Sequence, residues 1–169
     1  REEELFNGYK DVKFGENKGL DYLVNKASGI DVIIGGPPCQ AYSVAGRVRD
    51  EHGMKDDYRN YLFEHYCSVV ARYKPLAFVF ENVPGLLSAT PDGTPIVERI
   101  RKGFRDIGYE IVDDLKKYAR IDASDYGVPQ ARKRMVIVGL RRGCSSDVQS
   151  ELHDFYQKIL PKNKKKKIT

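Results

Sequence analysis

Several features that define common classes of protein are missing from this sequence of 169 residues. It has no tryptophan and three cysteines, an odd number spread widely along the chain, which argues against a disulfide framework and favours a reducing compartment. No apolar run approaches the roughly 20 residues that a membrane-spanning helix needs. The polar N-terminus also lacks the apolar region of a signal peptide. We therefore expect a cytoplasmic protein with one folded core and no membrane association.

An excess of one charge is also missing from most of the chain. The formal net charge is +5, but the segment 162–167 alone contains five lysines, so the remainder is balanced. Composition alone therefore does not indicate nucleic-acid binding, and any basic surface must be local. The three histidines show no metal-ligand spacing with one another or with the cysteines, so we expect no metal site.

Apolar runs alternate along the chain with amphipathic segments. Three runs are typical of buried strands: 31–35, 76–81 and 135–140. Four segments carry apolar residues at helical spacing: 18–26, 62–73, 95–107 and 148–159. A further strand is expected over 109–115. This alternation predicts an α/β fold with a mostly parallel sheet and flanking helices.

The most specific pattern follows the first predicted strand, where residues 35–40 read Gly-Gly-Pro-Pro-Cys-Gln. Glycine permits backbone conformations that other residues avoid, and proline fixes φ, so this segment presents one thiol rigidly at a strand end. An inert buried cysteine needs no such frame. Cys39 is therefore the candidate nucleophile, whereas Cys67 lies in a predicted amphipathic helix and Cys144 lies beside a turn.

Polar clusters border the other two predicted strands. Residues 81–83, Glu-Asn-Val, end the second strand, and residues 130–134, Gln-Ala-Arg-Lys-Arg, directly precede the third. In open α/β sheets ligands bind in a crevice at the strand ends, so we expect Cys39, a carboxylate and two arginines to meet there. Asn82 is expected to hold a loop rather than to touch a substrate.

In these three motifs the chain resembles the DNA (cytosine-5) methyltransferases, which carry Pro-Cys-Gln, Glu-Asn-Val and Gln-x-Arg-x-Arg in the same order. The resemblance covers residues 11 to 142. It implies part of a Rossmann-like fold that uses S-adenosyl-L-methionine as methyl donor. It also implies double-stranded DNA as partner, a restriction-modification or orphan role, and a cytoplasmic, nucleoid-associated location. In this family a cysteine thiolate adds to carbon 6 of cytosine, which makes carbon 5 reactive toward the donor.

The resemblance implies a role for each motif residue. Cys39 would be the nucleophile, and Glu81 would hydrogen-bond ring nitrogen 3 and the exocyclic amine of the base. Arg134 would bind the oxygen at ring carbon 2, and Arg132 would support the site or a phosphate. Simpler interpretations stay open: Glu81 could cap a helix or pair with a surface arginine, and the two arginines could be solvated at the start of a strand.

A donor site and a DNA-contacting loop are implied as well. Gly36, Pro38 and Leu62 match positions that line the donor pocket, and Asp11 matches an acidic residue that contacts adenine. A place in the helix core is an equal alternative for Leu62. The long polar segment 41–57 is expected to act as a lid. The residues on or beside it that would screen an extruded base are Gln40, Ser43 and Arg59.

The family's donor-binding turn, Phe-x-Gly-x-Gly, has no counterpart in the chain, so we expect the first cofactor-binding strands to be missing. We predict a partial catalytic domain over 1–143, and a C-terminal helix with a solvated basic tail over 144–169 that links to an absent target-recognition region. Such a segment alone is expected to bind the donor poorly and to be inactive. A complementing segment would then carry the donor-binding and target-recognition parts.

Other functions are compatible with parts of the pattern. Transfer RNA cytosine-5 methyltransferases share Pro-Pro-Cys-Gln and Glu-Asn-Val, although their Cys-Phe-Thr element is missing here. Thymidylate synthases also use a Pro-Cys thiolate on carbon 6 of a pyrimidine, but with histidine where Gln40 stands. The chain could also be a non-catalytic DNA-binding remnant, which trapping of a covalent adduct would distinguish from an enzyme.

Overall fold

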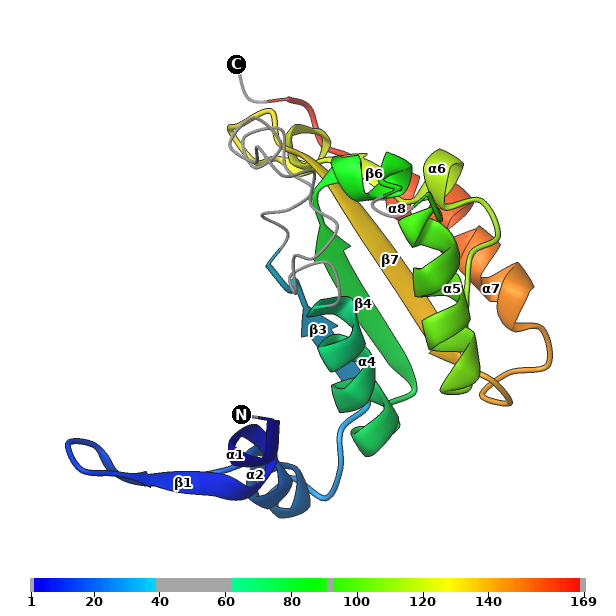
Figure 1. The fold of residues 1–169 in the computed structure, drawn as a ribbon. Coiled ribbons are helices and arrows are strands. Elements are labelled where there is room, and N and C mark those ends of the chain that lie inside the picture. The colour runs from blue at the N-terminus through cyan, green and yellow to red at the C-terminus, as the bar shows by residue number, and fades with distance from the viewer. Residues whose placement is uncertain (1, 39–61, 91–92, 168–169) are drawn as a thin grey trace.

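The structure is a computed structural model that describes residues 2–38, 62–90 and 93–167. Its centre is a five-stranded sheet in the order β3-β4-β7-β5, with β6 paired to β7 beside β5 (Figure 1). The strands of this sheet are β3 (Val32–Gly35), β4 (Ala77–Asn82), β5 (Tyr109–Ile111), β6 (Arg120–Asp122) and β7 (Lys133–Arg141). Helices flank the sheet, so the predicted α/β class is confirmed.

The strand directions correct the expectation of a mostly parallel sheet. β3 and β4 are parallel, but β7 runs antiparallel to β4, β5 and β6. A parallel neighbour would require a long crossover, usually a helix, between the two strands. β7 instead follows β6 through the short segment 123–132, which contains one turn of 3₁₀ helix, η4 (Ala123–Tyr126). The chain therefore folds back beside β6 as an antiparallel partner.

Two amphipathic helices, α4 (Leu62–Tyr73) and α5 (Ile96–Asp106), cover one face of the sheet. Each buries a single stripe, which in α4 consists of Phe63, Tyr66, Cys67 and Val70. In the buried stripe of α5, Phe104 packs against Phe78 and Phe80 of β4. After α5 the chain turns at Gly108, whose φ of +91° suits glycine at a helix end.

Aromatic side chains fill the centre of the core between these helices and β4. Phe78, Phe80 and Phe104 are fully buried. The rings of Phe78 and Phe104 stack with centroids 4.0 Å apart, and Tyr66 meets Phe80 edge to face at 5.2 Å. Large aromatic rings bury more apolar area than aliphatic side chains, so this cluster is a main source of the stability of the sheet.

The outer edge of β7 has a gap between β5 and β6, and a tyrosine fills it. The hydroxyl of Tyr156 accepts a hydrogen bond from the Val138 N–H at 2.8 Å and donates to the Val136 carbonyl at 2.9 Å. Tyr156 belongs to a π-helical turn, η5 (Phe155–Ile159), between α7 (Val148–Asp154) and α8 (Leu160–Lys162). Burial of its ring raises the pKa of the Tyr156 hydroxyl to about 12. This C-terminal segment is thus bonded directly to the sheet.

The N-terminal residues form a small unit that projects from the lower end of α4 (Figure 1). Its elements are α1 (Glu2–Asn7), the hairpin of β1 (Gly8–Asp11) and β2 (Gly15–Lys18), and α2 (Leu20–Lys26). The Asp21 carboxylate accepts hydrogen bonds from Arg72 and Tyr73 of α4. These bonds, led by that from Arg72, lower the pKa of Asp21 to about 2.

The remaining described elements are short. They are η3 (Pro84–Ser88) and α6 (Leu115–Tyr118). The strand expected over 109–115 ends at Ile111, because residues from Leu115 onward form α6. Among the described helices, none combines the length and the apolar character that crossing a bilayer requires.

Candidate active site

The candidate site lies where β4 ends and β7 begins. Glu81 of β4 pairs in register with Val136 of β7, so Arg134 is the diagonal neighbour of Glu81 on the same face. The Arg134 Nε lies 2.8 Å from the Glu81 Oε1 atom. The Glu81 side chain keeps 43% of its surface exposed, whereas Arg134 keeps 21%. The structure therefore brings together two of the predicted catalytic residues as an ion pair that solvent can reach on the carboxylate side.

The backbone directly after β3, the other neighbour of β4 in the sheet, approaches the Glu81 carboxylate. A Cβ atom added to Gly36 would lie 2.7 Å from the Glu81 Oε2, which is closer than such atoms pack, and 3.3 Å from the Glu81 carbonyl oxygen, which is a tight contact. A side chain at position 36 would therefore displace the Glu81 carboxyl group from its present position. Gly36 was predicted as a donor-site residue, and this close approach to Glu81 is a constraint that the sequence pattern did not reveal.

Asn82 links the two loops that border the site. Its side chain is buried, with 5% of its surface exposed. The Nδ2 atom donates to the Pro37 carbonyl at 3.1 Å, and the Oδ1 atom accepts from the Val83 N–H at 2.8 Å. Asn82 thus holds the backbone two residues before Cys39, in agreement with its expected role in fixing a loop.

Several predicted residues fall on the part of the chain that the structure leaves undescribed. The described backbone stops at Pro38, which directly precedes the candidate nucleophile in sequence. The predicted residues outside the described ranges are Cys39, Gln40, Ser43 and Arg59. Their roles stay predictions.

Arg132 is held near the site through its backbone. Its N–H donates to the Asp122 Oδ1 at 3.1 Å, and its carbonyl accepts from the Ala123 N–H at 3.0 Å. The same Asp122 oxygen also accepts from Ser124, and hydrogen bonds from Ser124 are the main cause that lowers the pKa of Asp122. The turn after β6 therefore fixes the approach of the chain to Arg134.

The predicted donor-site residues are not all brought together. Gly36 and Pro38 lie at the carboxyl end of β3, and Leu62 is half-buried at the first described position of α4. Asp11 ends β1 of the N-terminal hairpin, which Figure 1 shows at the opposite end of the molecule from the carboxyl end of β4. There its carboxylate accepts from the N–H groups of Lys13 and Phe14, both at 2.7 Å, and so stabilises the hairpin turn.

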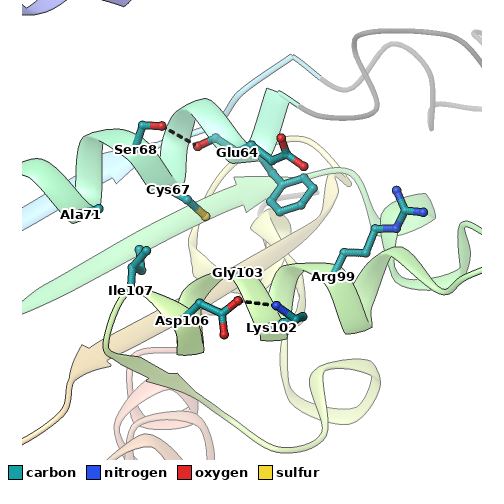
Figure 2. A pocket seen from close by; sticks show the side chains of 10 residues that line it. Glu64, Cys67, Ser68, Ala71, Arg99, Lys102, Gly103, Asp106 and Ile107 are labelled. Atoms are coloured by element: carbon teal, nitrogen blue, oxygen red, sulfur yellow. Dashed lines mark hydrogen bonds and ion pairs between the residues drawn. The ribbon is translucent and has the colours of Figure 1, made fainter.

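A separate cavity of about 580 Å³, whose lining includes neither Glu81 nor Arg134, lies between α4 and α5 (Figure 2). Its lining includes Phe63, Cys67 and Ile107, and Glu64 and Asp106 contribute polar groups. Burial raises the pKa of the Cys67 thiol to about 12, so this sulfur stays protonated and unreactive. None of the lining residues belongs to the predicted motifs, and Cys67 keeps its structural interpretation.

Comparison with known proteins agrees with the motifs. The sequence model of the C-5 cytosine-specific DNA methylase family matches residues 7–169. The chain is 45% identical over 121 residues to the type II methyltransferase M.Bpa9945I of Bacillus paralicheniformis, covering 70% of this chain and 27% of that protein. It is 41% identical over 114 residues to the type II methyltransferase M.XorII of Xanthomonas oryzae pv. oryzae, covering 68% and 24%.

A solved structure shows the same fold. This Escherichia coli protein, assigned as a DNA modification methyltransferase encoded within a prophage, has a TM-score of 0.54 and 31% identity to the chain. The match covers 78% of this chain and 33% of that one. The chain thus spans about a quarter of the length of the curated relatives named above. It belongs to the C-5 cytosine-specific DNA methylase family.

Proposed function

We propose that the chain is the central catalytic segment of a DNA (cytosine-5) methyltransferase. Its reaction is methyl transfer from S-adenosyl-L-methionine to carbon 5 of cytosine in double-stranded DNA, through a covalent bond between Cys39 and the base. The observation that carries the proposal is the pair of Glu81 and Arg134, 2.8 Å apart at the end of the strand neighbouring the Cys39 loop. Family membership supports the same reaction. A bacterial enzyme of this kind acts in the cytoplasm on nucleoid DNA.

The residues of the chain divide the chemistry between them. The Cys39 thiolate adds to carbon 6 of the flipped cytosine, and the electron pair of the 5,6 double bond becomes available at carbon 5. Glu81, carrying a proton in this step, donates a hydrogen bond to ring nitrogen 3 and accepts one from the exocyclic amine, so that its proton meets the negative charge that develops on the ring during the addition. Arg134 holds Glu81 in position and offers guanidinium donors to the oxygen at carbon 2. Loss of the proton at carbon 5 then lets the Cys39 sulfur leave.

The donor would be held by Gly36, Pro38 and Leu62. The first two fit such a ligand, because they lie exposed at the carboxyl end of β3, the edge of an α/β sheet where ligands bind. When bound, S-adenosyl-L-methionine supplies an electrophilic methyl group. We leave Asp11 out of this proposed donor site, because Figure 1 shows its strand, β1, at the other end of the molecule from the carboxyl end of β3.

A complementing segment is part of the proposal. Within the described part of the chain, β3 pairs only with β4 and leaves its other edge free. Val32 and Ile34 on its outer face are 50% and 75% exposed, on the same face of the sheet as Glu81. Exposed apolar side chains on an unpaired strand are typical of a surface that another segment covers. We propose that this segment carries the rest of the donor site.

Trapping of a covalent adduct tests the function. A chimera of M.Bpa9945I in which this chain replaces the matching segment would be incubated with labelled donor and duplex DNA that contains 5-fluorocytosine. Fluorine at carbon 5 blocks the elimination step, so the bond to sulfur persists through denaturation. We expect an adduct that Cys39→Ser abolishes and Cys67→Ser preserves.

Two results would count against this function. A chimera with native circular dichroism that forms no adduct would contradict catalysis and favour the non-catalytic remnant. An adduct on 5-fluorocytosine RNA but not on DNA would favour the transfer RNA enzyme.

A further inference from the structure

The described lysines of the C-terminal run are exposed to solvent, as expected, and the run also contacts the body of the protein. The Nζ atoms of Lys164 and Lys167 each lie 3.1 Å from an oxygen of the Asp125 carboxylate. The Lys165 N–H donates to the Asp125 carbonyl at 2.8 Å. The side chains of Lys167 and Lys164, with Lys167 the larger contributor, lower the pKa of Asp125. Asp125 of η4 therefore contacts three positions of the run: 164, 165 and 167.

This anchor point belongs to the same turn that carries Arg132. Asp122, three residues before Asp125, accepts from the Arg132 N–H, and Ala123 donates to the Arg132 carbonyl. Two residues further along, Arg134 pairs with Glu81. A chain of direct contacts thus connects the lysine run to the candidate active site. Figure 1 shows the C-terminal segment at the end of the sheet where β7 begins.

Most of the net charge of the protein gathers at this end. We define the basic edge as six exposed cationic residues: Arg132, Lys133, Lys164, Lys165, Lys166 and Lys167. With the two carboxylates beside it, Asp122 and Asp125, the basic edge has a net charge of +4, against +5 for the whole chain. The positive potential is therefore local, on one side of the site, and the rest of the chain is close to neutral.

We propose that the basic edge binds the phosphate backbone of duplex DNA next to the target cytosine. The proposal rests on the proposed function for the identity of the polyanion. Exposed lysines attract phosphates without regard to base sequence, which positions a duplex but does not specify a site. Asp125 is the positioning residue, because it holds the lysines at a fixed place relative to Arg134.

The salt dependence of DNA binding measures this role directly. The edge variant carries Lys164→Ala, Lys166→Ala and Lys167→Ala. The control variant carries Lys10→Ala, Lys13→Ala and Lys18→Ala, which remove the same charge from exposed positions on the N-terminal hairpin. Affinity of the full chain for a fluorescent duplex is measured by anisotropy between about 50 and 200 mM KCl.

The two variants should separate clearly. Each lost phosphate contact lowers the slope of log K against log salt by about 0.9, so we expect the edge variant to lose about 2 to 3 units of slope. The control should lose less than about one unit, because its lysines lie at the far end of the molecule. Equal losses in the two variants, an unchanged slope in the edge variant, or no binding of DNA by the chain would overturn the proposal.

This measurement is independent of the test for methyl transfer. A folded chimera that forms no adduct, together with the expected slopes, would refute catalysis and leave the DNA-binding surface standing. An adduct together with unchanged slopes would support the enzyme and refute the basic edge.

Discussion

Replacement of Asn82 by alanine would test how the active-site loops are held. Asn82 is buried and bonds to two backbone groups on different loops: its Nδ2 donates to the Pro37 carbonyl, and its Oδ1 accepts from the Val83 N–H. Alanine can make neither bond. The substitution would therefore leave a donor and an acceptor without partners in a region that water reaches poorly.

The expected loss of stability follows from these two bonds. An unpaired buried polar group costs about 1–3 kcal/mol, so two groups together with partial relaxation give about 2–4 kcal/mol. For a domain of this size, each kcal/mol lowers the melting temperature by about 2–4 °C, which predicts a decrease of about 5–15 °C. The substitution should also release the backbone before Cys39. A misplacement of about 1 Å can slow a reaction about 100-fold, so adduct formation in the chimera should slow by about 10- to 100-fold.

Urea denaturation followed by circular dichroism measures the first effect, and the trapping assay measures the second. Ser88→Ala is the matched control, because the Ser88 hydroxyl donates to the Gly85 carbonyl at an exposed position. That variant should lose less than about 0.5 kcal/mol. A loss for Asn82→Ala as small as that of the control would refute the reasoning that this side chain holds both loops.

Three further substitutions test other parts of the structure. Gly36→Ala places a methyl group 2.7 Å from the Glu81 Oε2, which should displace the carboxyl group and slow adduct formation about tenfold or more; a normal rate in the trapping assay would show that the carboxyl group needs no such space. Tyr156→Phe removes a hydroxyl that bonds to two backbone groups of β7, so urea denaturation should show a loss of about 2–4 kcal/mol. Tyr118→Phe, whose hydroxyl accepts one exposed hydrogen bond, should cost less than about 1 kcal/mol, and equal losses for the two tyrosines would be inconsistent with the bonding to β7. Because the pKa of Asp21 falls from 3.8 to about 2 on folding, its contribution is complete above about pH 4 and disappears as the pH falls toward 2. Asp21→Asn should therefore be less stable than the natural protein at pH 6, with a difference in urea midpoint that shrinks at pH 2.5; a constant difference would contradict the assigned cause.

The local elements of the fold were predictable from short stretches of sequence. The runs that form β3, β4 and most of β7, and the helical stripes of α4 and α5, repeat with the periods of strands and helices over only a few residues. Family membership was also predictable, because the three motifs occur in order along the chain. The small hairpin of β1 and β2 was missed, since its strands are short, polar and exposed.

Relations between distant segments were not predictable in the same way. The antiparallel direction of β7 depends on how the short connection after β6 turns. The spacing of apolar residues along the chain does not indicate the direction of that turn. The ion pairs between Asp125 and the lysine run join segments that are far apart in sequence. The local sequence around Asp125 does not indicate these lysines as its partners, and the sequence around the lysines does not indicate Asp125. Asp11, predicted from its place in the sequence to contact the donor, ends β1, which Figure 1 shows at the far end of the molecule from the carboxyl end of β3.

The sequence by itself determined which chemical groups this protein has and which strand ends carry them. A thiol framed by glycine and proline, a carboxylate after a buried strand and arginines before another are local facts of the chain. Only the tertiary structure decided that Glu81 and Arg134 pair diagonally across β4 and β7, with Gly36 leaving space for the carboxylate. The physical reason is that local patterns depend on backbone conformation within a few residues, whereas strand register and packing depend on the whole core at once.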